Sequence, residues 1–188
     1  MASPSHDSTQ QRDTGHHHPY PNGDFMQTMD KLADFIHREH NALRPHVELI
    51  RVAGDAVGEV PLSILRELTN TVLGFLVREL MPHGRDDHDI LYRTLEQATQ
   101  TPGSTATMNR EHLEMSKMAD ELGNLHALTV AEAELSERTT RELRRVLYGL
   151  YALINLHFAK EEEIYADVLE HRLSTTEKDL LVATLGRH

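Results

Sequence analysis

The 188-residue sequence contains no cysteine and no tryptophan. Without cysteine the chain can form no disulfide bond, no thiolate metal site and no cysteine nucleophile. Aromatic residues make up only 5% of the chain, whereas 39% of its residues are hydrophobic. A core must therefore be built mainly from aliphatic side chains, which suits helices that pack through leucine, valine and alanine.

Positive charge is also scarce, because 19 lysines and arginines stand against 30 aspartates and glutamates, for a net charge of −11. Nucleic acids and anionic membranes attract basic faces, so we expect neither as a partner. The most apolar stretch, 143–158, contains two arginines, an asparagine and a histidine, which are too polar for a membrane span. The N-terminus lacks a basic start followed by an apolar run, so we expect a cytoplasmic protein.

The chain divides into a polar tail and a helical part. Residues 1–23 have almost no aliphatic side chains and are predicted to be a disordered tail, in which the run His16–His18 has no function. From residue 24 onward, apolar residues recur at steps of three and four, which predicts helices. We expect them at about 24–54, 61–98, 105–125, 131–170 and 174–185. Ser174 and Glu177 form a capping-box pattern at the start of the last helix.

Short connections and the lack of any strand pattern indicate an all-α fold. We predict an up-down antiparallel four-helix bundle over residues 24–171, with residues 172–188 forming a short fifth helix that packs on it. Gly54 and Gly58 are expected to end the first helix. Pro45 and Pro82 fall inside the first and second helices, where each removes a hydrogen bond and should cause a kink.

The triplet Arg-Glu-His occurs at 38–40 and again at 110–112. It opens a larger repeat, in which a histidine on one helix is followed by His-x-x-x-carboxylate on the next. The members are His40, His83 and Asp87 in the first half, and His112, His157 and Glu161 in the second. Random placement would give roughly two His-x-x-x-carboxylate pairs in such a chain. The number of pairs therefore does not distinguish a site from chance. Their position on the helices must make that distinction.

All six residues fall on the apolar stripes of their helices. The second stripe reads Val72, Phe75, Glu79, His83, Asp87, Ile90, and the fourth reads Leu143, Leu147, Leu150, Ile154, His157, Glu161, Ile164, Val168. On the first and third helices, His40 follows Ile36 and His112 follows Met108 at the same spacing. Burying unpaired ionisable groups is costly, and metal coordination would compensate for that cost.

Residues four apart share one helix face, so each histidine and its carboxylate can reach the same or adjacent ions. Four imidazoles and two carboxylates suit a dinuclear site. Nitrogen and oxygen ligands without sulfur favour iron or manganese, with zinc as a further candidate. The alternative is a bundle in which the same histidines pair with carboxylates and bind no metal. The placement of all six residues on core stripes favours the metal site.

The segments EHNALRPHVELI, LMPHGRDDHDILY, TATMNREHLEM and LHFAKEEEIY together resemble the bacterial hemerythrin-like, or HHE cation-binding, family. The resemblance covers about residues 24–171. It implies an up-down four-helix bundle around a non-haem di-iron centre, with His40, His83, Asp87, His112, His157 and Glu161 as ligands. Members of this family bind dioxygen, respond to oxygen or nitric oxide, handle iron, or react with peroxide.

The sequence departs from the oxygen-carrying hemerythrins at two positions. Ser116 stands where those proteins have a second histidine on the third helix, and Asp87 stands where relatives commonly have glutamate. A missing histidine leaves a coordination position open or recruits another ligand. The candidates for that role are His37, His46, Glu111, Glu162 and Tyr165. Tyr92 is expected to pack in the core, and the two residues after Glu161 are expected to face solvent.

Three functions follow from this resemblance. The first is a di-iron protein that binds or senses O2 or NO. The second is a di-iron redox enzyme that acts on peroxide or nitric oxide. The third is an iron-storage or iron-responsive module, which would need further ions or a protein partner that the sequence does not identify.

Overall fold

The computed structural model describes residues 31–131 and 133–187. Within these residues all regular structure is helical, and no helix combines the length and the apolar character that a membrane span requires. The predictions for residues 1–23, for the run His16–His18 and for residues 24–30 of the first helix lie outside the described residues.

Four long helical segments and one short helix make up the described chain. They are α2 (Lys31–Ala56); a continuous segment of α3 (Leu62–Phe75), η1 (Leu76–Leu80), α4 (Met81–Asp86), η2 (Asp87–Leu91) and α5 (Tyr92–Thr99); α6 (Ala106–Ala131); a second continuous segment of α7 (Glu137–Lys160), η3 (Glu161–Tyr165) and α8 (Ala166–Arg172); and α9 (Thr175–Leu185).

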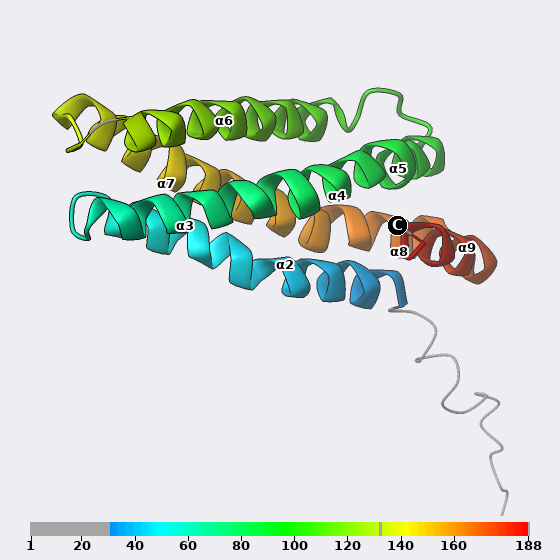
Figure 1. Cartoon of the computed structure of the whole chain (residues 1–188). Helices are drawn as coiled ribbons and strands as arrows, with labels where there is room; N and C mark the ends of the chain where they lie inside the picture. Colours follow the sequence, from blue (N-terminus) through cyan, green and yellow to red (C-terminus); the bar gives the residue numbers. More distant parts are fainter. Residues whose placement is uncertain (1–30, 132, 188) are drawn as a thin grey trace, which may run out of the picture.

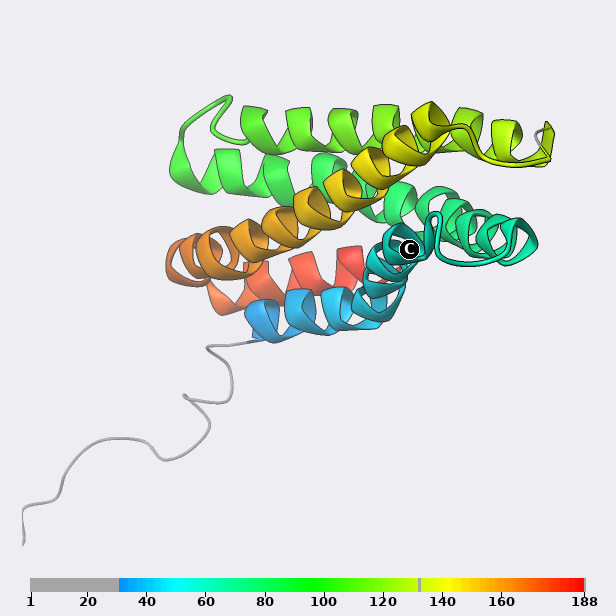
Figure 2. The same ribbon diagram turned by 90° about the vertical axis from the view of Figure 1, so that its left-hand side faces the viewer.

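The four long segments form a ring around one core. α2 packs against α3 and α7, and α6 packs against the same two helices from the opposite corner. Figures 1 and 2 show the segments lying alongside one another, with α9 beside α2 at the end where α8 lies. The predicted four-helix bundle with a short fifth helix is confirmed. The predicted capping box is also present, because Ser174 and Glu177 bond to each other's backbone N–H groups.

The connection between the third and fourth long segments differs from the prediction. α6 continues to Ala131, six residues beyond the predicted end, and α7 begins only at Glu137. The Ser136 side chain accepts a hydrogen bond from the Thr139 backbone N–H, which satisfies one of the unpaired donors at the start of α7. This cap fixes where the helix begins, and the apolar spacing alone did not reveal it.

One of the two glycines expected to end the first helix does not, whereas both prolines lie inside helical segments as predicted. Gly54 lies inside α2, and only Gly58, with a φ of +79°, lies in the turn that follows. α2 continues through Pro45. Pro82 lies two residues after the end of η1, and Met81 between them donates its N–H to the Leu76 carbonyl five residues earlier. The π-helical turn thus changes the hydrogen-bond pattern next to the residue that lacks an N–H.

The other two π-helical turns begin at the two predicted carboxylate ligands. Asp87 is the first residue of η2, and Glu161 is the first residue of η3. Each wide turn shifts the face that the following residues present. Ile164 is therefore 52% exposed rather than buried. Ile90 is only partly buried, and Leu91 takes the core position instead. The stripes predicted with a constant helical period were wrong beyond these points.

Two apolar clusters fill the bundle and leave a polar layer between them. The larger includes Val47, Leu80, Met115 and Phe158, and the smaller, at the α8–α9 end, includes Leu91. On each long segment the predicted ligands lie where the chain passes from one cluster to the other. This arrangement surrounds the ionisable groups with aliphatic side chains on both sides.

Candidate metal centre

All six predicted ligands come together in the polar layer. One group of facing ligand atoms belongs to His40, His83 and Glu161, and the other belongs to Asp87, His112, His157 and Glu161. Within each group the atoms lie within 4.8 Å of one another. Glu161 is common to both groups, so its two oxygens can serve two adjacent cation positions.

The first group joins α2, α4 and η3. His40 Nε2 lies 3.1 Å from Glu161 Oε2, and both side chains are buried. The His40 ring stacks on Phe158, with 4.0 Å between ring centroids. His83 Nε2 lies 3.3 Å from Asp87 Oδ2, and the His83 side chain is 18% exposed. His83 is therefore the member of this group that solvent can reach.

The second group joins η2, α6, α7 and η3. His112 Nε2 lies 2.8 Å from His157 Nε2, and His157 Nε2 lies 3.3 Å from Glu161 Oε1. An added Cβ at Gly84 would lie 3.2 Å from the His112 ring, so the absence of a side chain there lets α4 and the imidazole approach closely. With Asp87, this group brings four nitrogen and oxygen ligand atoms within 4.8 Å of one another.

A carboxylate holds the outer nitrogen of one histidine in each group. Glu162 accepts from His40 Nδ1 at 2.8 Å and from the Arg44 guanidinium at 2.7 Å. Glu111 lies 3.0 Å from His157 Nδ1 and also pairs with Lys160. Such contacts fix the ring orientation and leave Nε2 directed inward as a ligand. The expectation that Glu162 faces solvent was wrong, because its side chain is only 10% exposed.

Within the described chain, His83 and His112 have no ion pair at Nδ1, and burial therefore sets their protonation states. Burial lowers the pKa of His83 to about 4, with a further contribution from the charge of His40. Burial likewise lowers the pKa of His112 to about 4, and the neighbouring His157 acts in the same direction. Both imidazoles are therefore neutral at pH 7, which is the form that binds metal ions.

The two carboxylates have opposite shifts. Burial, together with the charge of Glu161, raises the pKa of Asp87. Burial also opposes ionisation of Glu161, but its contacts with the imidazoles of His157 and His40 outweigh it and lower the pKa. The pKa of His157 is raised, since the acceptors Glu161 and Glu111 outweigh its burial. The buried charge thus centres on Glu161.

The donor atoms fit a bound cation. His83 Nε2, Asp87 Oδ2 and Glu161 Oε2 are buried without a hydrogen-bond partner in the described chain. Unsatisfied buried polar atoms are rare, and each costs free energy unless a ligand takes its lone pair. Here His83 and Asp87 each belong to one of the two ligand groups, and Glu161 belongs to both. Imidazole and carboxylate donors without sulfur are the set that iron, manganese and zinc accept.

The less certain candidate ligands do not join either group. The His37 side chain is 50% exposed and lies 3.6 Å from Glu162. His46 lies 3.4 Å from Glu79, well along α2 from the cluster. Tyr165 is half-buried and meets the edge of the Tyr92 ring. Glu111 and Glu162 contact histidines from the outside, as described above, and so orient the predicted ligands.

Tyr92 is the site residue that the sequence reasoning missed. It was expected to be core packing, but its hydroxyl donates to Glu161 Oε1 and lies 3.3 Å from His157 Nε2 and 3.4 Å from His112 Nε2. Tyr92 follows Asp87 by five residues, a spacing that faces away on a regular α-helix. Because η2 is a π-helical turn, residue 92 lies over residue 87 instead. The spacing of five between Asp87 and Tyr92 predicts a shared face only if the π-helical turn is already known.

A cavity of about 530 Å³, here called the apolar pocket, leads from the surface between α4 and α6 to this cluster. Its walls include Leu80, Met81, Leu113, Met115 and Phe158, and its inner end is formed by His83, His112 and His157. Ser116 also lines it. The pocket therefore extends from the surface to three imidazoles of the cluster.

Comparison with protein families also points to a cation-binding domain. The family model for the hemerythrin HHE cation binding domain matches residues 31–169, which is most of the chain and includes every residue of the cluster. Neither the curated proteins nor the solved structures yielded a match. The match, the helical bundle and the buried histidine–carboxylate cluster agree, and the chain belongs to the hemerythrin HHE cation-binding family.

Proposed function

We propose that this cation-binding domain holds two iron ions and binds or senses O2 or NO. The observation that carries the proposal is the pair of ligand groups that share Glu161 and end an apolar pocket. Four imidazoles and two carboxylates supply enough donors for two ions, with fewer imidazoles than an oxygen-carrying hemerythrin has. Bound iron supplies the redox chemistry with which such small molecules react.

The apolar pocket suits small, weakly polar molecules. O2 and NO enter aliphatic surroundings readily, whereas charged solutes must lose their hydration to do so. Ser116 contributes a small side chain to the wall in place of an imidazole. His83, which borders the pocket and has no hydrogen-bond partner at Nε2, marks the side of the cluster that arriving molecules meet first.

Metal content tests the first half of the proposal. We expect about two iron ions per chain after anaerobic loading of protein in which His16–His18 are replaced by alanine to remove binding by the tail. A His83→Ala, His157→Ala double variant should lose most of this iron. The matched control is His37→Ala, His171→Ala, which removes two histidines that lie outside the cluster. Equal iron in both double variants would contradict the site.

Spectroscopy of the iron-loaded protein tests the second half. Exposure of the reduced protein to O2 or NO should change its visible absorption, and removal of the gas should reverse the change. A Ser116→Trp variant, which narrows the apolar pocket without removing a ligand, should slow the change by about tenfold. A visible absorption spectrum that changes with neither O2 nor NO would contradict both binding and sensing.

One observation favours the second function, an enzyme that processes peroxide or nitric oxide. The Tyr92 hydroxyl lies inside the cluster and donates to Glu161, which places a proton and an oxidisable ring beside the metal ligands. In that case the iron-loaded protein should turn over many equivalents of peroxide or NO. Tyr92→Phe should lower the turnover, and Tyr165→Phe, one ring further out, should not.

Iron storage would require more than two ions per chain, so the same metal analysis decides it. Small molecules remain the proposed partners, and we propose no nucleic-acid, membrane or protein partner. A cytoplasmic location likewise remains a prediction, and cell fractionation with an antibody against the chain would test it.

A further inference from the structure

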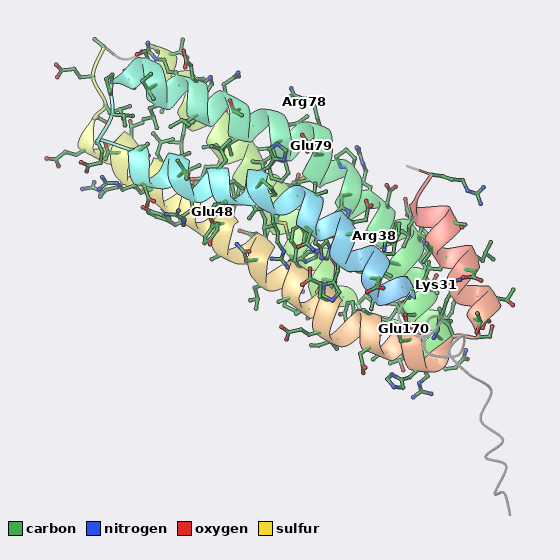
Figure 3. The ribbon with its side chains drawn as sticks, turned by 90° about the horizontal axis from the view of Figure 1, so that it is seen from below. Lys31, Arg38, Glu48, Arg78, Glu79 and Glu170 are labelled. Atoms are coloured by element: carbon green, nitrogen blue, oxygen red, sulfur yellow. The ribbon has the colours of Figure 1, made fainter. Side chains whose placement is uncertain are left out.

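A second cavity reaches the cluster from another side. It has a volume of about 230 Å³ and lies between α2 and the segment formed by η1, α4 and η2. We call it the acidic opening, because Glu39, Glu79, Asp86 and Asp87 line it together with His40 and His83. Figure 3 views the molecule from the side of α2, with Glu79 and Arg78 labelled on the neighbouring segment.

The inner end of the acidic opening consists of unsatisfied ligand atoms. Asp87 is only 4% exposed, and its Oδ2 atom has no hydrogen-bond partner in the described chain. His83 Nε2, 3.3 Å away, is also without one. A cation that passed through this opening would therefore meet a free carboxylate oxygen and a free imidazole nitrogen before it reached Glu161.

The outer part of the opening carries uncompensated negative charge. Among the described residues, no ion pair neutralises Glu39 or Asp86, and both raise the pKa of Asp87 through their charge. Glu79 lies at the same rim, 3.4 Å from His46. The one guanidinium in the lining, that of Arg78, lies against Gly74, one turn back along the helix and away from His83.

The two cavities differ in chemistry but meet at one residue. His83 lines both of them. The apolar pocket lies between α4 and α6, and the acidic opening lies between α4 and α2, so the two cavities flank α4 on adjacent sides of the helical ring. A hydrated divalent cation is disfavoured by aliphatic walls and attracted by carboxylates, so the two approaches select for different solutes.

We propose that metal ions load the cluster through the acidic opening, with Glu39 and Asp86 as the groups that attract the incoming cation. This inference rests on the proposed metal centre and adds the route by which that centre is filled. Glu39 and Asp86 are not ligands of the filled site. They raise the local concentration of cations at the rim, and Asp87 and His83 then take the ion inward.

The test measures the rate of metal uptake, separately from the amount bound. Metal-free protein with His16–His18 replaced by alanine is mixed with cobalt(II) chloride, and the visible absorption of the bound ion is followed by stopped flow. We expect Glu39→Gln, Asp86→Asn to load about threefold more slowly, and Glu39→Lys, Asp86→Lys about tenfold more slowly. Both variants should reach the final cobalt content of the parent.

A matched control removes the same charge elsewhere. Glu114→Gln, Asp120→Asn changes two exposed acidic residues of α6 that line neither cavity, and it should load at the parent rate. Raising the salt from 0.1 to 1 M should shrink the difference between parent and variants, because the screening length falls from about 10 to about 3 Å. Blocking the apolar pocket with Ser116→Trp should leave cobalt uptake unchanged.

The outcomes separate this route from the metal centre itself. If the Lys variant loads as fast as the parent and to the same extent, the route is wrong and the centre stands. If Ser116→Trp slows cobalt uptake instead, metal ions load through the apolar pocket. If the parent takes up no cobalt and no iron, the proposed centre fails and this inference fails with it.

Discussion

Oε1 of Glu162 lies 2.8 Å from Nδ1 of His40, although 122 positions separate the two residues in the chain. The same carboxylate is held by Arg44, one turn along α2 from His40. A residue next to a predicted ligand on one helix therefore orients a predicted ligand on another. The arrangement gives Glu162 a role that its neighbour Glu163, which is exposed, does not share.

Glu162→Gln should weaken metal binding by about 10- to 100-fold, because the outer contact of His40 becomes weaker and its ring less well oriented. The matched control is Glu163→Gln, one position along, which should leave affinity unchanged. Competition with a chelator of known affinity measures the difference. Equal affinities for the two variants would show that the orientation of His40 does not depend on this carboxylate.

Gly84→Ala should displace the His112 ring, since the added Cβ would lie 3.2 Å from two of its atoms. We expect the metal content to fall while helix content stays the same. Gly123→Ala is the control, because its Cβ would meet nothing nearer than Leu73 at 4.0 Å, and it should stabilise α6 by about 1 kcal/mol. Metal analysis and thermal unfolding distinguish the two effects. A Gly84→Ala protein with full metal content would show that the ring can move without loss of the site.

Tyr92→Phe should destabilise the metal-free protein by about 1 to 3 kcal/mol, because the buried Glu161 carboxylate loses a hydrogen bond. The aromatic ring and its packing remain, so the decrease in the free energy of unfolding measures the contribution of the hydroxyl alone. Urea unfolding of the metal-free variant and parent gives the difference. Unchanged stability would mean that another group or a water molecule replaces the hydroxyl at Glu161.

Acid should destabilise the metal-free protein through His83 and His112. Both pKa values are lowered to about 4 in the folded state, whereas an unfolded histidine titrates near 6.5. Between these values the unfolded chain binds more protons, so stability rises with pH and is lost as pH falls from about 6.5 to about 4. The raised pKa of His157 acts in the opposite direction and reduces the net effect.

Urea unfolding of the metal-free protein at pH 7 and pH 5 measures this dependence. The variant His83→Gln, His112→Gln removes both titrating groups and should flatten the curve by about 1 kcal/mol or more across that interval. His37→Gln, His171→Gln, which changes two exposed histidines, should leave it unchanged. An identical pH dependence in all three proteins would mean that other groups cause the acid sensitivity.

The two Arg-Glu-His triplets show how far an internal repeat can be interpreted. Their histidines, His40 and His112, both lie in the cluster, as the repeat predicts. Their glutamates do not play equivalent parts, because Glu111 contacts His157 on the neighbouring helix α7 whereas Glu39 borders the acidic opening. The spacing within a helix set the position of each histidine. The neighbouring helix decided what each glutamate meets.

The sequence by itself determined the helical bundle and the set of six candidate ligands. Ionisable residues on apolar stripes are visible without a structure, because a helix that buries one face repeats at a fixed period. The same reasoning fails where that period changes. The π-helical turns at Asp87 and Glu161 moved Ile164 to the surface and brought Tyr92 into the cluster.

Only the tertiary structure decided how the ligands are grouped and approached. That Glu161 belongs to both groups, that Glu162 orients His40, and that His83 borders two cavities of different chemistry all depend on contacts between helices far apart in the chain. Local spacing cannot predict such contacts, because the angle and depth at which helices pack are set by the side chains of both partners together.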